Sequence, residues 1–159
     1  MKKTLTIALA SFLIFGFIQQ SNGQNLTSLQ KSMVEKQVDS VFHAMIKAAE
    51  KLDYDKLSKG VDDRYNAGFI VNAVYYPKYD LLANLLKANI QGSARQSITI
   101  QKQKISVLSD KIVLLTATGK ANVEINSNQS FSTNFLWSFV YQKFGNEWKV
   151  IQSHQSQAN

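Results

Sequence analysis

The hydrophobic residues of this chain repeat with a helical period up to about residue 90 and with a two-residue period after it. In the first part, apolar residues recur every three or four positions: Leu29, Met33, Val34, Val38, Val41, Phe42, Met45, Ile46, Ala49 and Leu52. That spacing predicts one face of a long helix. The alternation that follows predicts half-buried strands. Helices first and strands after favour an α+β fold, with the helices packed on one face of a sheet.

Capping residues support the long helix and a second, shorter one. Thr27 or Ser28 can cap the long helix, because a hydroxyl accepts a hydrogen bond from a free N–H of the first turn. Asp53 can cap a short helix that runs to Leu57, and Gly60 then ends it. The sequence therefore predicts a helix, a tight junction and a second helical turn before residue 61.

Residues 61–92 predict a short strand followed by a third helix. The strand is expected at residues 68–71, and residues 75–77 predict a break in regular structure. Pro77 suits the first turn of the helix that follows, and Gly92 suits its end. The apolar residues of that helix again have helical spacing: Leu81, Leu82, Leu85, Leu86 and Ile90.

Four long strands are predicted from residue 98 to about His154. The parity of the apolar residues changes near Lys102, which indicates a β-bulge there. Residues 113–125 and 131–141 then each keep one parity, and short turns separate the strands. Such strands form an antiparallel meander.

Residues 1–23 have the pattern of a signal peptide. Two lysines near the start precede an apolar run over residues 5–18, and Ser21 and Gly23 are the small residues expected before cleavage at Gln24. The alternative is a membrane anchor, but the run is shorter than the roughly 20 residues that span a bilayer. We therefore expect a bacterial protein exported to the periplasm or the extracellular space, with no stable membrane insertion after cleavage.

The remaining residues, 24–159, are expected to fold as one domain, since a chain of this length can bury a sufficient core. The absence of cysteine excludes disulfides, thiol nucleophiles and a lipid-modified N-terminal cysteine.

Loss of the two leader lysines lowers the formal charge from +7 to +5, and the other lysines are mixed with acids, so we expect no nucleic-acid partner. Because the two histidines are far apart in the sequence and cysteine is absent, we expect no metal site, and we expect no cofactor.

Two segments resemble the NTF2-like superfamily, in its SnoaL-like or DUF4440-type branch. One is the junction at residues 52–57; the other is the last hairpin, residues 144–156, which has a glycine, a tryptophan three residues later and the ending His154-Gln155-Ser156. The similarity covers residues 29–156. It implies a cone in which a curved sheet and the helices enclose a cavity for a small molecule.

In such a cone the inward parity places an aromatic wall on the cavity, faced by side chains from the first helix. The ligand-lining residues expected in this way are Phe42, Met45, Phe135, Trp137, Phe139 and Tyr141, with Phe131 on the same parity. The simpler interpretation for any one of them is core packing. As a set they predict a site for a small, mostly apolar molecule.

Enzymes of the superfamily, such as ketosteroid isomerase, scytalone dehydratase and polyketide cyclases, place acids, histidine or tyrosine inside the cone for proton transfer. No acid between residues 97 and 154 has the inward parity. The remaining candidates are a histidine, His43 or His154, with an aspartate such as Asp62 or Asp80.

Three functions remain open from the sequence. Binding without turnover is favoured, because the expected acids are missing. The alternatives are a small dehydratase, isomerase or hydrolase that uses a cavity histidine with an aspartate, and a non-catalytic dimerisation module. For the latter, Leu136 and Val140 would give the outer face of the sheet a partly apolar surface for a homodimer.

Overall fold

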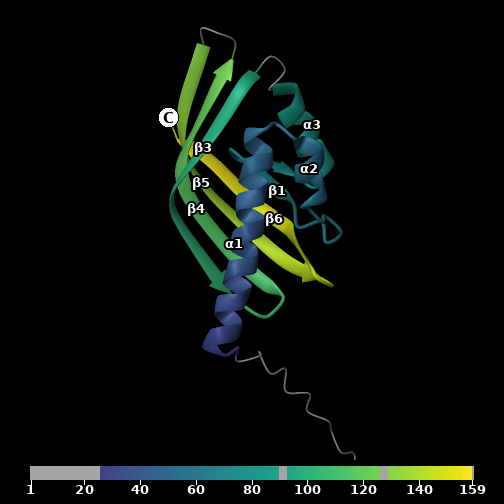
Figure 1. Cartoon of the computed structure of the whole chain (residues 1–159). Helices are drawn as coiled ribbons and strands as arrows, with labels where there is room; N and C mark the ends of the chain where they lie inside the picture. Colours follow the sequence, from purple (N-terminus) through teal and green to yellow (C-terminus); the bar gives the residue numbers. More distant parts are fainter. Residues whose placement is uncertain (1–25, 90–92, 126–128, 159) are drawn as a thin grey trace, which may run out of the picture.

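The computed structural model describes residues 26–89, 93–125 and 129–158. There, three helices lie against the concave side of one curved sheet of six strands (Figure 1). The helices are α1 (Ser28–Glu50), α2 (Tyr54–Lys59) and α3 (Tyr79–Asn89). The strands are β1 (Phe69–Val71), β2 (Val74–Tyr76), β3 (Ser93–Val107), β4 (Ile112–Ile125), β5 (Gln129–Phe144) and β6 (Glu147–Ala158). The predicted α+β class is confirmed.

Helix α1 is the long amphipathic helix that the sequence predicts. Thr27 caps it, and Gln30 completes a reciprocal capping box with Thr27. The buried side chains of this helix follow the predicted face: Val34, Val38, Phe42, Ile46 and Ala48. Leu29 and Met33 belong to the same apolar pattern but are 72% and 53% exposed, because the start of α1 projects beyond the sheet (Figure 1).

The segment between α2 and α3 differs most from the sequence-based expectation. Residues 75–76, predicted to break regular structure, instead belong to β2, which pairs antiparallel with β1. The two strands are joined by Asn72 and Ala73, both with positive φ (46° and 67°), as a tight hairpin turn requires. Helix α3 begins two residues after Pro77, and Asp63 Oδ2 accepts a hydrogen bond from the backbone N–H of Tyr79 (3.2 Å).

The strand order in the sheet is β2-β1-β6-β5-β4-β3. Strands β3 to β6 form the predicted antiparallel meander, and β1 adds to β6 in parallel. The predicted bulge is present between Ile100 and Lys102 in β3. The predicted helix end at Gly92 lies outside the described residues, and so do residues 126–128 of the short turn predicted after the strand at residues 113–125. So does the predicted signal peptide.

A second bulge, in β6, was not predicted and changes which side chains face inward. Tyr141 pairs with Val150 and Val140 with Gln152, so Ile151 has no partner on β5. Beyond it Ser153 is buried, at 1% exposed, and His154 is exposed. Simple alternation places His154 on the face of Trp148 and Val150, but the extra residue reverses the alternation and His154, considered above as a cavity histidine, faces outward.

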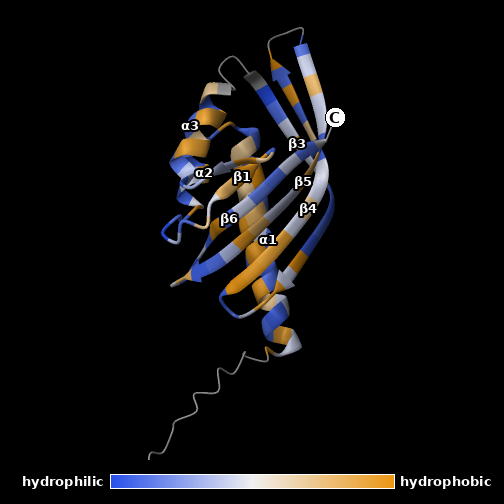
Figure 2. Cartoon of the chain, turned by 180° about the vertical axis from the view of Figure 1, so that it is seen from behind, coloured by the Kyte–Doolittle hydropathy of each residue, from blue (hydrophilic) through white to orange (hydrophobic). Residues whose placement is uncertain are grey.

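The core lies between α1 and the middle of the sheet. Its fully buried members include Val38, Phe42, Val113, Leu115 and Tyr141. Figure 2 shows the alternation of hydrophilic and hydrophobic residues along the strands, which the two-residue period predicted. The core fills one end of the cone, and the other end remains hollow.

Candidate functional site

The hollow end of the cone is a cavity of about 490 Å³. Every helix and every strand described above contributes to its lining. Most of the lining side chains are aliphatic: Met45, Ile46, Ala49, Leu57, Val61, Val71, Val74, Leu82, Leu85, Leu86, Ile98, Ala121, Val123, Ile125 and Val150. A cavity of this size and composition suits a small organic molecule.

An aromatic wall on β5 forms one side of the cavity. It consists of Phe131, Trp137 and Phe139, and Phe69 on β1 also lines the cavity. The ring of Trp137 packs edge-on against Phe139, with centroids 6.3 Å apart and planes at 78°. These rings give a ligand a broad, rigid contact surface.

Only half of the predicted lining residues lie on the cavity. Met45, Trp137 and Phe139 line it, together with Phe131. The others are buried in packing contacts instead: Phe42, Phe135 and Tyr141. Phe42 packs against Phe139 and so closes the core end of the cone (centroids 6.0 Å apart).

Phe135 has the right parity, but a neighbouring ring covers it. Trp137 stacks on Phe135 with centroids 3.7 Å apart and planes at 14°. On β4, Gly119 leaves room for the same ring, since a Cβ there would lie 2.7 Å from Phe135 Cζ and would collide with the Thr99 carbonyl oxygen. Trp137 therefore presents its outer side to the cavity while Phe135 supports it from behind.

A polar wall on β6 faces the apolar ones. Beyond the bulge, Ser153, Gln155 and Gln157 point inward and line the cavity. Gln155 Nε2 donates to Ser153 Oγ (3.2 Å). The backbone N–H of Gln157 donates to Asn72 Oδ1 (3.0 Å), and Asn72 also lines the cavity. These residues are not predicted from the sequence, because the alternation before Ile151 assigns them to the outer face.

Three tyrosines belong to the lining: Tyr54, Tyr76 and Tyr79. Burial raises the pKa of Tyr54, and burial together with the nearby Tyr54 raises the pKa of Tyr79 to about 12. Both therefore stay protonated near neutral pH, as hydrogen-bond donors and not as bases.

The lining residues include no aspartate, glutamate, histidine, lysine or arginine among those that the structure describes. His43 lies on α1 outside the cavity and is half-exposed. Its Nδ1 lies 3.0 Å from the carbonyl oxygen of Asp39 and 3.4 Å from Asp39 Oδ1. His154 is exposed opposite Ser138 on the outer face of the sheet.

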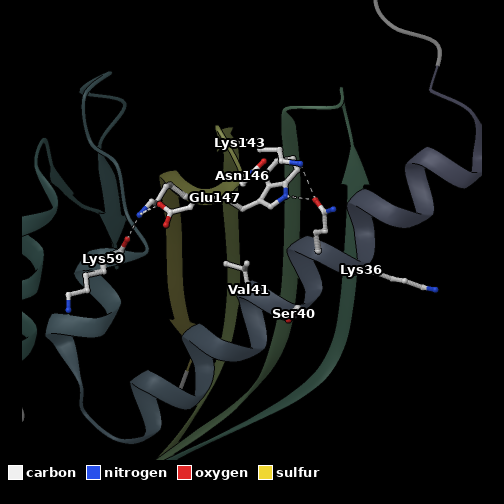
Figure 3. Close-up of a pocket in the computed structure, with 10 residues that line it drawn as sticks. Lys36, Ser40, Val41, Lys59, Lys143, Asn146 and Glu147 are labelled. Carbon is white, nitrogen blue, oxygen red and sulfur yellow. Dashed lines mark hydrogen bonds and ion pairs between the residues drawn. The ribbon is translucent and has the colours of Figure 1, made fainter.

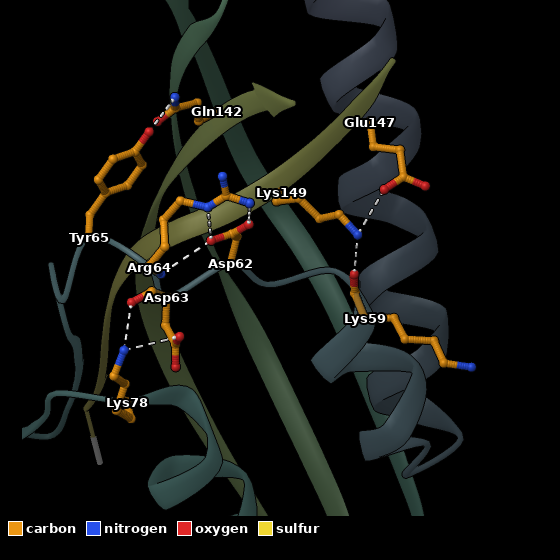
Figure 4. A network of polar contacts seen from close by, with 9 residues as sticks. All are labelled: Lys59, Asp62, Asp63, Arg64, Tyr65, Lys78, Gln142, Glu147 and Lys149. Atoms are coloured by element: carbon orange, nitrogen blue, oxygen red, sulfur yellow. Dashed lines mark hydrogen bonds and ion pairs between the residues drawn. The ribbon is translucent and has the colours of Figure 1, made fainter. Parts of the chain in front are cut away.

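The predicted aspartate candidates also lie outside the cavity. Asp62 forms an ion pair with Arg64 (2.6 Å), whose hydrogen bonds lower the pKa of that carboxyl group (Figure 4). Asp80 is exposed in the first turn of α3. The structure thus does not bring His43 or His154 together with either aspartate at the cavity.

A second concavity, of about 780 Å³, lies over the middle of α1 beside the β5–β6 turn (Figure 3). Four lysines line it: Lys36, Lys59, Lys143 and Lys149. Trp148 Nε1 donates to Gln37 Oε1 there (3.0 Å), and Lys143 Nζ donates to the same oxygen (3.3 Å). This groove is open and basic, and its polar contacts fasten α1 to the sheet. The enclosed apolar cavity is therefore the better candidate site.

Two further properties concern the described residues alone. Within residues 26–89, 93–125 and 129–158, no helix has the length and hydrophobicity needed to cross a membrane. In the same ranges, no group of three or more histidine, aspartate or glutamate residues is placed to hold a metal ion.

Comparison with solved structures identifies the architecture. A putative scytalone dehydratase from Novosphingobium aromaticivorans superposes with a TM-score of 0.75, over 84% of this chain and 89% of that chain, at 7% identity. An NTF2-like superfamily protein from Salmonella enterica serovar Typhimurium gives 0.69, over 81% and 94%, at 16% identity. The chain has the NTF2-like fold. The resemblance inferred from the residue 52–57 junction and the last hairpin is confirmed at the level of fold.

NTF2-like domains differ widely in their chemistry, and the fold alone does not select one. A hexachlorocyclohexane dehydrochlorinase, LinA type 2, is also similar, with a TM-score of 0.70 over 84% of this chain and 90% of that one, at 11% identity. No protein-family model matches the chain, and neither does any curated protein. Its function therefore has to be argued from the cavity of this NTF2-like domain itself.

Proposed function

We propose that this NTF2-like domain binds a small, mostly apolar, uncharged molecule in the cavity and releases it unchanged. One observation carries the proposal: the cavity is apolar on most sides, and none of its described lining residues is charged at neutral pH. A charged ligand would lose its hydration there without gaining a counter-ion. An apolar ligand would bury its surface against rigid aromatic rings.

Binding without turnover is favoured over catalysis by the same lining. Proton transfer needs an acid or a base within hydrogen-bond reach of the substrate. The dehydratase, isomerase or hydrolase considered above would use His43 or His154 with Asp62 or Asp80, and all four lie outside the cavity. The dehydratase and dehydrochlorinase in the comparison share the fold, and at 7% and 11% identity that likeness carries no chemistry to this chain.

The test uses N-phenyl-1-naphthylamine, a neutral apolar dye that fluoresces more strongly when it leaves water. We expect saturable binding to the folded protein. Ala121 lies on the cavity wall, so the larger side chain of Ala121→Phe should fill part of the space that the dye occupies. The dye would then lose part of its buried apolar contact with the protein. We expect its dissociation constant to rise at least about tenfold, which corresponds to roughly 1.4 kcal/mol of binding free energy. Asn122→Phe is the matched control, because Asn122 is exposed on the other face of β4.

The outcome is decisive if both variants keep the thermal unfolding midpoint of the parent protein to within a few degrees. Equal loss of binding in the two variants would show that the dye binds elsewhere on the surface. Absence of saturable binding to the parent protein would contradict the proposal.

We further propose that the domain acts after export, with cleavage before Gln24. The support is the residue pattern of positions 1–23 alone. Mass spectrometry of the protein recovered from outside the cytoplasm should find Gln24 as the first residue. Recovery of the chain with Met1 retained would contradict this.

A further inference from the structure

The cavity has two chemically different sides, and this difference restricts the ligand more narrowly than size and hydrophobicity do. The aromatic side on β5 is Trp137 and Phe139, and their neighbours across the strand pair are Gln155 and Ser153. The lining therefore changes from rings to amides and a hydroxyl between two adjacent strands. A ligand large enough to fill this cavity would contact both sides.

The polar wall can both donate and accept hydrogen bonds. In Gln155, one N–H is used by Ser153 Oγ, and among the described residues the carbonyl oxygen has no partner. In Gln157, the carbonyl oxygen accepts from Asn72 Nδ2 (3.4 Å), while its own amide nitrogen donates to no described residue. Whichever way an amide is turned, it presents an acceptor at one end and donors at the other.

A hydroxyl group matches such a wall, because it donates one hydrogen bond and accepts others. Gln155 and Gln157 are alternate residues of one strand, so their amides lie on the same face. A carboxylate would match it less well, since it cannot donate and no lysine, arginine or histidine is among the described lining residues. A pure hydrocarbon would leave the partly buried amide of Gln155 desolvated without a partner, whereas Gln157 is exposed.

We infer that the ligand is an uncharged alcohol or phenol. Its apolar body lies against Trp137 and Phe139, and its hydroxyl group lies against Gln155 and Gln157. This inference rests on the proposed binding function and names the class of molecule that the same cavity takes.

The experiment compares three probes that share one ring system: naphthalene, 2-naphthol and 2-naphthoate. Each displaces N-phenyl-1-naphthylamine from the folded protein at pH 7, and the dissociation constant is obtained from the competition. We expect 2-naphthol to bind roughly three- to tenfold more tightly than naphthalene, the usual gain from one neutral hydrogen bond. We expect 2-naphthoate to bind at least about tenfold more weakly than 2-naphthol.

The variant Gln155→Leu removes the amide and keeps the volume of the side chain approximately. It should reduce the affinity for 2-naphthol to that for naphthalene and should leave naphthalene binding at least as tight. Gln152→Leu is the matched control, the same substitution on the same strand but on the outer face, opposite Val140. Thermal unfolding and far-ultraviolet circular dichroism are the measurements that check whether both variants are folded.

A separate readout does not depend on any variant. In NMR spectra of the parent protein, 2-naphthol should shift the side-chain amide signals of Gln155 and Gln157 more than naphthalene does. Equal affinity for naphthalene and 2-naphthol, or an unchanged ratio in Gln155→Leu, overturns the inference while leaving the proposed function intact. Failure of all three probes to displace the dye overturns this inference as well. Failure of the dye itself to bind is the result that overturns the proposed function.

Discussion

Among individual side chains, residues that share one face of β5 have different roles. Phe135, at 4% exposed, supports Trp137 from behind, and Trp137 carries the contact surface. Between them, Leu136 points to the other face and is 51% exposed. Because of this alternation, we expect the side chains on the inner face of β5 to contribute most of the strand's share of the free energy of unfolding.

Trp137→Ala should therefore destabilise the protein by about 3 kcal/mol, since it removes a stacked indole from the inner face. Leu136→Ala should change the free energy of unfolding by less than about 0.5 kcal/mol, because the leucine is half-exposed. Urea denaturation of the two variants measures the difference. Similar losses in both would mean that the two faces of β5 are assigned incorrectly.

The buried tyrosines should make the free energy of unfolding fall as the pH rises into the alkaline range. Burial raises the pKa of Tyr79 from 10.0 to about 12, so the unfolded chain loses this proton first as the pH rises. The stabilisation is complete below pH 10 and is lost between pH 10 and about 12. Tyr141, which is fully buried and also has a raised pKa, acts in the same direction.

We expect the free energy of unfolding to fall by about 2 kcal/mol or more between pH 9 and pH 11.5, since a pKa unit corresponds to about 1.4 kcal/mol. Tyr79→Phe should make this fall smaller, because the variant has no phenol at this position. Denaturant titrations at the two pH values provide the measurement. A fall of unchanged size in Tyr79→Phe would contradict the role given to this tyrosine.

At the scale of elements, the β1–β2 hairpin brings Asn72 to the edge of the cavity. Its two-residue turn holds Asn72 and Ala73 in the left-handed region, where asparagine is tolerated and alanine is strained. The usual second residue of such a turn is glycine. Because alanine stands in that place, the turn has no clear signal in the sequence.

Ala73→Gly should stabilise the protein by about 1 kcal/mol, since glycine adopts a φ of 67° without the clash of a Cβ. Ala44→Gly, at an exposed position in the middle of α1, is the opposite control and should cost about 1 kcal/mol. Thermal unfolding of both variants shows whether each substitution raises or lowers the stability. A loss of stability in Ala73→Gly would show that the turn is not strained.

Local patterns predict elements well and fail where one residue shifts the register. The helix caps at Thr27 and Asp53, the meander and the bulge near Lys102 all follow from spacing and residue type. The bulge at Ile151 was not predicted, although the adjacent apolar residues Val150 and Ile151 interrupt the alternation there. That single residue turns His154 outward and brings Gln155 to the cavity.

Across the whole molecule, the fold is predictable because the hydrophobic residues repeat first with a helical period and then with a two-residue period. The residues that line the cavity are only partly predictable. Trp137 and Met45 are inward residues by simple parity and do line the cavity. Phe42 and Tyr141 satisfy the same parity but lie where α1 packs directly on the sheet. The position of a residue in the alternation predicts which face of the sheet its side chain is on. Whether that side chain then lines the cavity or packs against α1 depends on how the sheet curves over the helix, which is a tertiary property.

The central claim is that this cavity, and not the lysine-lined groove, holds the ligand. Nuclear Overhauser effects between bound N-phenyl-1-naphthylamine and methyl groups of the protein test it most directly. Met45 lines the cavity, Val41 lines the groove, and Met33 is exposed at the start of α1. We predict effects from the dye to the Met45 methyl group and none to Val41 or Met33. Effects to Val41 without any to Met45 would contradict the account.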